Sequence, residues 1–358
     1  MRVGILGYSL SSLALAQALV NEKIYVDIFF QNKIAKINST RTLGVSKSNV
    51  EYFNKNIINI DKIKWKLNKI EILSDNLKNE ELINFESETE YLFSIIKNFK
   101  LFDKLKKNLS KNKYFNTKNS RIKTDINEKY NLVINMDYNN LITKKYFNKK
   151  IIKTYNSHAY TTIISHEKIF NDTALQIFTH RGPLAFLPIS NEETSVVFSA
   201  HNVAKNKFEN FDQLLTKYNS KYKIKKINKT ELFELKGLSL RSYYHKNILA
   251  FGDLLHRIHP LAGQGFNMTI RDIITLMKII KNKISLGLPL DETVNIDFEK
   301  NVKHKNFIFS SGIDLIHEFF NLERKTKNSF LSKSVQIFGK NPSIKKIFTK
   351  IADEGFIN

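Results

Sequence analysis

The sequence predicts an α/β fold in which a parallel sheet is interleaved with a second, β-rich domain and followed by a helical C-terminus. Residues 2–31 have the pattern strand, buried helix, strand, which is the βαβ unit of a parallel sheet. Residues 151–201 have the pattern of several consecutive strands, and the chain after residue 267 is mostly helical. Because strand-rich stretches interrupt the βαβ elements, we expect discontinuous units: 1–60, 95–150 and 235–300 in the parallel-sheet domain, 61–94 and 151–234 in the β-rich domain, and 301–358 in a C-terminal helical segment.

The βαβ unit opens the chain. Val3 to Leu6 form a predicted buried strand, and Tyr25 to Phe30 form a second one. The helix between them is apolar on almost every side, which predicts that it is buried. Its apolar residues are Leu10, Leu13, Ala14, Ala16, Ala18 and Leu19.

Strand signals dominate the middle of the chain. Apolar alternation predicts a strand within residues 63–72, a helix-like segment follows at about 91–107, and a short buried strand is predicted at 132–134. Runs of β-formers between turn residues predict four more strands. These lie at 160–164, 174–179, 184–188 and 194–200.

Composition limits the class of protein. A chain of 358 residues with 42% hydrophobic content can form a large globular core. No window approaches 18 uninterrupted apolar residues, so we expect no transmembrane helix, and the N-terminus lacks the pattern of a signal peptide. The absence of Cys excludes disulfides, cysteine metal sites and thiol nucleophiles. A cytoplasmic location is the default expectation.

The net charge of +23 is large but spread along the whole chain. Lysines occur from Lys23 to Lys350 in short basic runs, and no nucleic-acid-binding signature accompanies them. We therefore expect no nucleic-acid partner and favour a Lys-rich composition as the explanation. Attraction to an anionic membrane surface remains an alternative.

The first turn is a weakened phosphate-binding motif. A dinucleotide fold carries G-x-G-x-x-G at this place, but here only Gly7 matches, followed by Ser9 and Ser12. Both serines are small, and their hydroxyls can donate to phosphate. Gln31 lies where an acidic residue would accept from ribose hydroxyls. A hydrogen bond to a neutral acceptor is weaker than one to a charged acceptor by about 1–2 kcal/mol. By itself this turn is more typical of an ordinary βαβ connection.

A glycine cluster at residues 252–267 is the most informative feature of the chain. It holds three of the 12 glycines and one of the 5 prolines. A buried strand at 248–251 leads into it, and a helix leaves it. Strand, glycine loop and helix N-terminus together hold an anionic group against free backbone N–H donors. One face of the helix carries Ile270, Ile273, Ile274, Met277 and Ile280.

Further residues follow a fixed order in this cluster: Gly252, Asp253, His256, His259, Pro260, Gly263, Gln264, Gly265, Asn267 and Asp272. The pattern closely resembles the second FAD motif of class A flavoprotein monooxygenases, and most closely that of the ubiquinone-biosynthesis hydroxylases. Three other segments are similar to family motifs and occur in family order: 41–46, 182–188 and 311–320. The family's middle Asp-Gly motif is altered to Asp137-Tyr138.

The resemblance implies a Rossmann-like FAD-binding domain interleaved with a β-sheet substrate domain. It implies that Asp253 binds the ribityl chain, that the Pro260 carbonyl lies near the flavin, and that Asn267 bonds the pyrimidine part of the ring. The helix N-terminus would stabilise the anionic reduced flavin. Arg41 resembles a flavin contact, with a surface or interdomain salt bridge as the alternative. The predicted cofactor-binding residues are Gly7, Ser9, Ser12, Gln31, Arg41, Gly252, Asp253, Pro260, Gly263, Gln264, Gly265, Phe266 and Asn267.

No catalytic side chain is assigned. His256 and His259 are three residues apart, but no third ligand at recognisable spacing suggests a metal. Loop fixing or packing is the favoured role of both, with proton transfer by His259 as the alternative.

The resemblance implies hydroxylation of the aromatic ring of a polyprenylated ubiquinone precursor. NAD(P)H would reduce FAD, and O₂ would form a flavin C4a-hydroperoxide that attacks the ring. Two alternatives remain open: a non-catalytic scaffold that binds lipid or other quinone-biosynthesis proteins, and a flavin-dependent reductase. The apolar and lysine-rich tail, residues 313–351, is typical of a helix that rests on the inner face of an anionic membrane, or simply of packing against the FAD domain.

Overall fold

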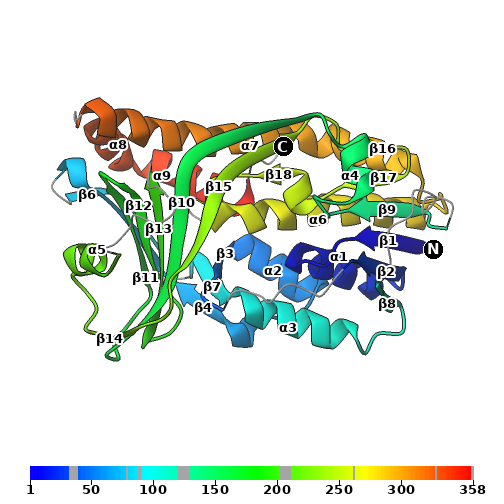
Figure 1. Cartoon of the computed structure of the whole chain (residues 1–358), viewed down its shortest axis with the longest axis horizontal. Helices are drawn as coiled ribbons and strands as arrows, with labels where there is room; N and C mark the ends of the chain where they lie inside the picture. Colours follow the sequence, from blue (N-terminus) through cyan, green and yellow to red (C-terminus); the bar gives the residue numbers. More distant parts are fainter. Residues whose placement is uncertain are drawn as a thin grey trace.

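The computed structural model describes residues 1–31, 39–77, 80–87, 90–119, 129–201, 211–260, 263–326 and 329–355 (Figure 1). A six-stranded sheet lies at the N-terminal side of the molecule in the order β16-β17-β9-β1-β2-β8. All its pairs are parallel except β16 with β17. The strands are β1 (Arg2–Leu6), β2 (Tyr25–Phe30), β8 (Phe115–Asn119), β9 (Leu132–Asn135), β16 (Tyr244–His245) and β17 (Ile248–Ala250).

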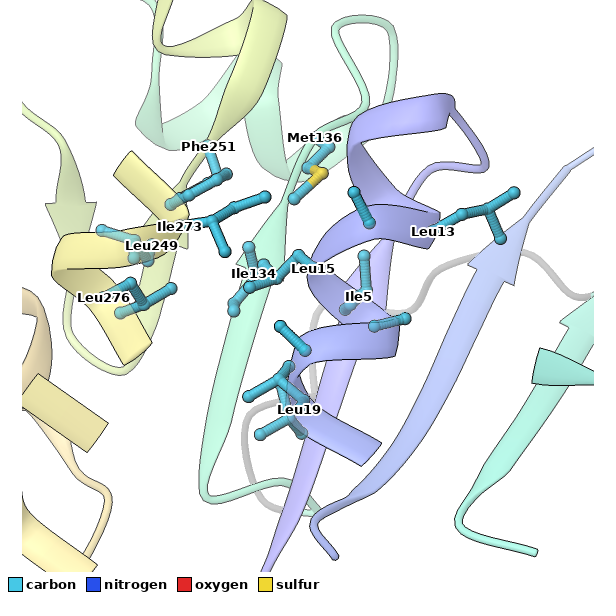
Figure 2. Close-up of a cluster of buried hydrophobic side chains, with 14 of the residues drawn as sticks. Ile5, Leu13, Leu15, Leu19, Ile134, Met136, Leu249, Phe251, Ile273 and Leu276 are labelled. Carbon is cyan, nitrogen blue, oxygen red and sulfur yellow. The ribbon is translucent and has the colours of Figure 1, made fainter. Parts of the chain in front are cut away.

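Three helices build the core of this sheet: α1 (Leu10–Asn21), α3 (Asn98–Leu109) and α6 (Gln264–Ser285). Residues 12–20 of α1 are all buried because the helix packs against the sheet and between α3 and α6. Figure 2 shows Leu15 of α1 beside Ile134 of β9, and the same core cluster includes Leu19 of α1 and Leu276 of α6. Full burial of such a side chain stabilises the fold by about 1.5–3 kcal/mol. The predicted buried helix and parallel sheet are confirmed.

The second sheet has the strand order β18-β15-β10-β13-β12-β11-β5-β6, with β14 beside β10. One face is covered by α5 (Phe211–Tyr218), which packs on Phe186 and Phe198. The four predicted strands of this region are confirmed. The strands are β5 (Lys69–Ser74), β6 (Glu80–Glu86), β10 (Lys150–His166), β11 (Thr173–Thr179), β12 (Gly182–Pro188), β13 (Glu193–His201), β14 (Ile224–Ile227), β15 (Glu231–Leu240) and β18 (His256–Arg257).

A small antiparallel sheet of β3 (Thr42–Ser46), β7 (Phe93–Lys97) and β4 (Lys64–Leu67) lies next to α2 (Lys47–Asn56). The helix predicted from residue 91 begins only at Asn98, so the prediction was wrong for 93–97. These residues form a strand because Ile95 and Ile96 are β-branched and become fully buried when β7 pairs with β3 and β4.

Three helices end the described chain: α7 (Glu292–Thr326), α8 (Phe330–Gly339) and α9 (Pro342–Glu354). The long α7 runs along both large sheets, and α9 returns to contact α2 and β3 (Figure 1). In the described ranges no helix is long and apolar enough to cross a membrane. The remaining helical elements are α4 (Leu141–Tyr146) and short 3₁₀ turns at Asp61–Ile63, Asp75–Leu77 and Gly252–Leu254.

Candidate functional site

Loops from three parallel strands meet at one edge of the six-stranded sheet. Gly7 follows β1, and Asp137 follows β9. Gly7 has φ +102, and a Cβ there would lie 3.1 Å from the Asp137 nitrogen. Gly252 follows β17 with φ +61, and a Cβ there would lie 3.4 Å from the Ser11 Cβ. The carboxyl edge of such a sheet is where α/β folds bind ligands, and glycine lets these loops approach each other.

Ser9 and Ser12 form a capping box at the start of α1. The Ser12 N–H donates to Ser9 Oγ at 3.2 Å, and the Ser9 N–H donates to Ser12 Oγ at 3.3 Å. Ser12 Oγ also donates to Met136 Sδ at 3.2 Å. Both hydroxyls therefore stabilise the helix start, and their contact with phosphate stays a prediction. Helix geometry leaves the N–H groups of Leu10 and Ser11 as the first-turn donors for a ligand.

The loop after β9 is held by a polar network that the sequence did not reveal. Asn135 Nδ2 donates to Thr143 Oγ1 at 2.7 Å, and Asn135 Oδ1 accepts from Asn140 Nδ2 at 2.8 Å. Thr143 Oγ1 donates to the Asp137 carbonyl at 2.6 Å. These bonds fix the loop although Tyr138 stands where the family pattern has glycine. The available signal was Asn140, an N-cap residue three positions before Thr143.

The start of α6 forms an open cradle. Gly263 is its N-cap with φ +64 and no side-chain cap, so the first N–H groups of the helix have no capping side chain. A Cβ at Gly263 would lie 3.4 Å from the Gly44 backbone, whereas a Cβ at Gly265 would meet nothing within 4 Å. Gln264 is 3% exposed, and no described residue forms a hydrogen bond with its Oε1. A flat group with negative charge fits beside this uncapped N-terminus.

Asn267 fastens the start of α6 to β3 and α2. Its side chain is fully buried. Asn267 Oδ1 accepts from the Ser46 N–H at 3.0 Å and from Asn49 Nδ2 at 2.9 Å. Asn267 Nδ2 donates to the Gly44 carbonyl at 3.0 Å. Protein groups thus bond both the oxygen and the nitrogen of the Asn267 amide, which was predicted to bond the flavin. The Asn267 side chain therefore positions the loop.

His256 fixes the loop before α6 at a second place. His256 Nε2 lies 2.5 Å from Asp272 Oδ2, and Asp272 Oδ1 accepts from Asn306 Nδ2 at 3.1 Å. The pair is buried and joins the loop to α6 and α7. This geometry agrees with a loop-fixing role for His256. No group of three His, Cys, Asp or Glu in the described residues could hold a metal ion.

The other predicted residues surround this edge. Asp253 is exposed, and no described residue pairs with its carboxylate. The exposed Arg41 places its guanidinium 5.6 Å from the Phe233 ring centroid. The Pro260 carbonyl accepts from the Gly263 N–H at 3.3 Å and closes the turn before α6. Phe266 is half-buried with its ring 6.4 Å from Phe53, and Gln31 is exposed after β2, next to residues outside the described ranges.

Comparison with known proteins shows which family and which fold the chain resembles. Residues 147–285 match the model of the FAD binding domain family. The structure is similar to p-nitrophenol 4-monooxygenase PnpA from Pseudomonas putida, with a TM-score of 0.78 and 10% identity over 97% of this chain and 96% of that one. The chain has the fold of the class A FAD-dependent monooxygenases. The Klebsiella pneumoniae protein HpxO, solved with FAD and uric acid, shares this fold with a TM-score of 0.76 and 11% identity, covering 99% of this chain and 97% of that one.

Curated relatives match only part of their own length. The chain is 31% identical over 156 residues to the 3-demethoxyubiquinol 3-hydroxylase of Escherichia coli strain K12. The aligned region covers 42% of this chain and 40% of the relative. The family that residues 147–285 match is named for FAD binding. The Cβ position of Gly265 is open, and no described residue pairs with Asp253.

Proposed function

We propose that this chain is an FAD-dependent monooxygenase that hydroxylates the aromatic ring of a polyprenylated ubiquinone precursor, with NAD(P)H as electron donor and O₂ as oxidant. The observation that carries the proposal is the uncapped start of α6, where Gly265 leaves open space beside free backbone N–H groups within the FAD motif. The substrate class rests on the name of the Escherichia coli relative.

In this proposal the residues at the site have different roles. Bound FAD supplies the reduction and activation of O₂. The N-terminus of α6 stabilises negative charge on the ring system, and the exposed Asp253 carboxylate accepts from hydroxyl groups of the cofactor. Asn267 and His256 do not need to touch the cofactor, since their buried hydrogen bonds keep the loop in place.

The second sheet closes over the same loop and limits the access of water. Thr42 Oγ1 of β3 donates to Ser195 Oγ of β13 at 2.9 Å. Thr40 Oγ1 lies 3.3 Å from Thr161 Oγ1 of β10, and this contact is buried. These bonds hold the sheet against β3, whose Gly44 contacts Gly263. A substrate ring held between sheet and flavin would be shielded from solvent.

Filling the cradle tests the cofactor site. We expect Gly265→Leu to weaken FAD binding by at least about tenfold, because the side chain occupies the space assigned to the ring. The matched control is Gly312→Leu on α7, where a Cβ also meets nothing within 4 Å. Flavin fluorescence titration measures both variants. Wild-type protein that takes up no FAD would favour the non-catalytic scaffold instead.

Isotope labelling tests the reaction. With ¹⁸O₂, a hydroxylase places one labelled oxygen atom in the quinone precursor and the other in water, with one NAD(P)H consumed per product. Turnover of NAD(P)H with a modified but unlabelled product would favour the reductase.

We also propose that α8 and α9 contact an anionic membrane surface. Phe338 and Phe348 are exposed at 59% and 50%. Lysines along the same helices would attract anionic lipid. Deleting the tail is a poor test, because Asp353 accepts hydrogen bonds from Ser48. Phe338→Ser with Phe348→Ser should reduce flotation with anionic vesicles, while Phe307→Ser on α7 should not. Unchanged flotation of the double variant would overturn this proposal, and co-purification of quinone-biosynthesis proteins would favour a protein partner.

A further inference from the structure

Three histidines lie together where α7 passes the second sheet. The ring centroids of His201 and His317 are 5.1 Å apart, and those of His317 and His259 are 4.5 Å apart. Tyr155 meets His259 edge-on at 4.9 Å. The three imidazoles come from β13, from the loop before α6 and from α7, so only the folded chain brings them together.

The ring nitrogens of two of these histidines lack partners. His259 is 1% exposed and His317 is 5% exposed, and neither ring has a hydrogen bond to a described residue. His317 Nδ1 is 3.7 Å from Glu318 Oε1, which is too long for one. Burying an unpartnered polar group costs about 1–3 kcal/mol. Two adjacent rings without described partners therefore offer hydrogen-bonding groups that a bound molecule could complete.

A pocket opens beside the cluster. Its lining includes His201 and His317 together with Phe178 and Phe320. The two phenylalanine rings are stacked at a centroid distance of 3.5 Å and 10° between planes. The pocket therefore combines an apolar wall with a polar end, which is the arrangement that orients an aromatic ring carrying polar substituents.

The charge around the cluster selects an uncharged ligand. Burial lowers the pKa of His259 to about 2 and also lowers the pKa of His317, so both rings are neutral at pH 7. Lys153, which also faces them, lies 3.5 Å from Asp314 Oδ2 and 3.2 Å from Glu318 Oε1. Each neutral imidazole offers one N–H donor and one acceptor. A hydroxyl group can both donate and accept a hydrogen bond, so it complements the donors and acceptors of these two rings.

The pocket lies near the predicted flavin loop. His259 directly precedes Pro260 in that loop, and it touches His317, which lines the pocket. On β13, residues 195 and 201 share one face because side chains alternate along a strand. Ser195 bonds Thr42, close to the Gly44–Gly263 contact. The face of β13 thus leads from the pocket to the start of α6.

We propose that His201, His259 and His317 form the polar end of a site for an uncharged aromatic ring that carries a hydroxyl group, with Phe178 and Phe320 as its apolar wall. The inference rests on the proposed function only for the identification of this ring with the hydroxylase substrate. The site itself is defined by the histidines and the pocket.

Two small probes test the site in the full-length, FAD-loaded protein. Isothermal titration should show that 2-methoxyphenol binds about tenfold more tightly than methoxybenzene, which lacks the hydroxyl group. In His317→Leu and His259→Leu this preference should disappear. The unfolding midpoint of these variants should stay equal or rise, because an unpartnered polar ring is replaced by an apolar side chain.

His166 provides the matched control. It is 2% exposed, with Nδ1 2.8 Å from the Glu167 carbonyl and Nε2 3.0 Å from Thr194 Oγ1. His166→Leu should lower the unfolding midpoint and leave the probe preference unchanged. Equal binding of the two probes by the wild type would overturn the inference, as would an unchanged preference in both cluster variants. FAD titration is a separate readout, so loss of FAD would count against the proposed function alone.

Discussion

Replacing Asn267 with leucine isolates what the buried amide does for the predicted flavin loop. Leucine has a similar size, so the change removes hydrogen bonds and leaves little empty space. It strands three protein groups that now bond the amide: the Ser46 N–H, the Asn49 amide and the Gly44 carbonyl.

The expected loss of stability follows from these three groups. Each buried donor or acceptor left without a partner costs about 1–3 kcal/mol. If Asn49 turns toward water, two groups remain stranded, so Asn267→Leu should lower the free energy of unfolding by about 2–6 kcal/mol, against the 5–15 kcal/mol typical of a folded chain. FAD affinity should fall too, because the loop between β3 and α6 loses its fastening.

Urea unfolding monitored by circular dichroism measures the change. The control is Asn301→Leu, an exposed residue that donates only to the Asp297 carbonyl at 2.7 Å and should change stability by less than about 0.5 kcal/mol. A loss below about 1 kcal/mol for Asn267→Leu would refute the reasoning, since the amide would then not be what fastens α6 to β3.

Three further predictions concern the same region. Asp253→Ala should weaken FAD binding far more than Ser9→Ala, which should instead cost about 1 kcal/mol of stability through the lost capping box, and titration with unfolding curves separates the two effects. Gly7→Ala should destabilise the fold by at least about 1 kcal/mol in calorimetry, because φ is +102 and the new Cβ approaches Asp137. His259 has its pKa lowered from 6.5 to about 2, so below pH 6.5 the unfolded chain binds a proton that the folded chain excludes. Wild-type stability should therefore fall by about 2 kcal/mol from this group between pH 7 and pH 5, and urea unfolding of His259→Leu should show a shallower fall.

The sequence predicted the elements whose signal is local. The βαβ unit and the start of α6 were recognisable because uninterrupted apolar runs and glycine positions encode them directly. The strand β7 was missed because five residues next to a helix carry too short a pattern. Its pairing with β3 and β4, which lie far apart in the sequence, decides its conformation.

The sequence motif named residues of the candidate site but could not predict their contacts. The motif pointed to Asn267, yet only the fold shows that its partners are Ser46, Asn49 and Gly44, over two hundred positions earlier. The histidine cluster was invisible for the same reason. His201 and His317 have no local pattern that relates them, and their proximity arises only because α7 passes along the second sheet.

The altered motifs need not mean an altered site. The first and middle motifs have lost glycines, but the loops that carry them still approach as closely as glycine allows, with Gly7 against Asp137 and Gly252 against Ser11. Polar side chains take over the fastening: Ser12 reaches Met136, and Asn135 bonds the loop after β9. The geometry at this sheet edge depends on these contacts rather than on the residue types of the family motif. FAD binding should accordingly be more sensitive to Asn267 and Gly265, which hold and form the cradle, than to Ser9.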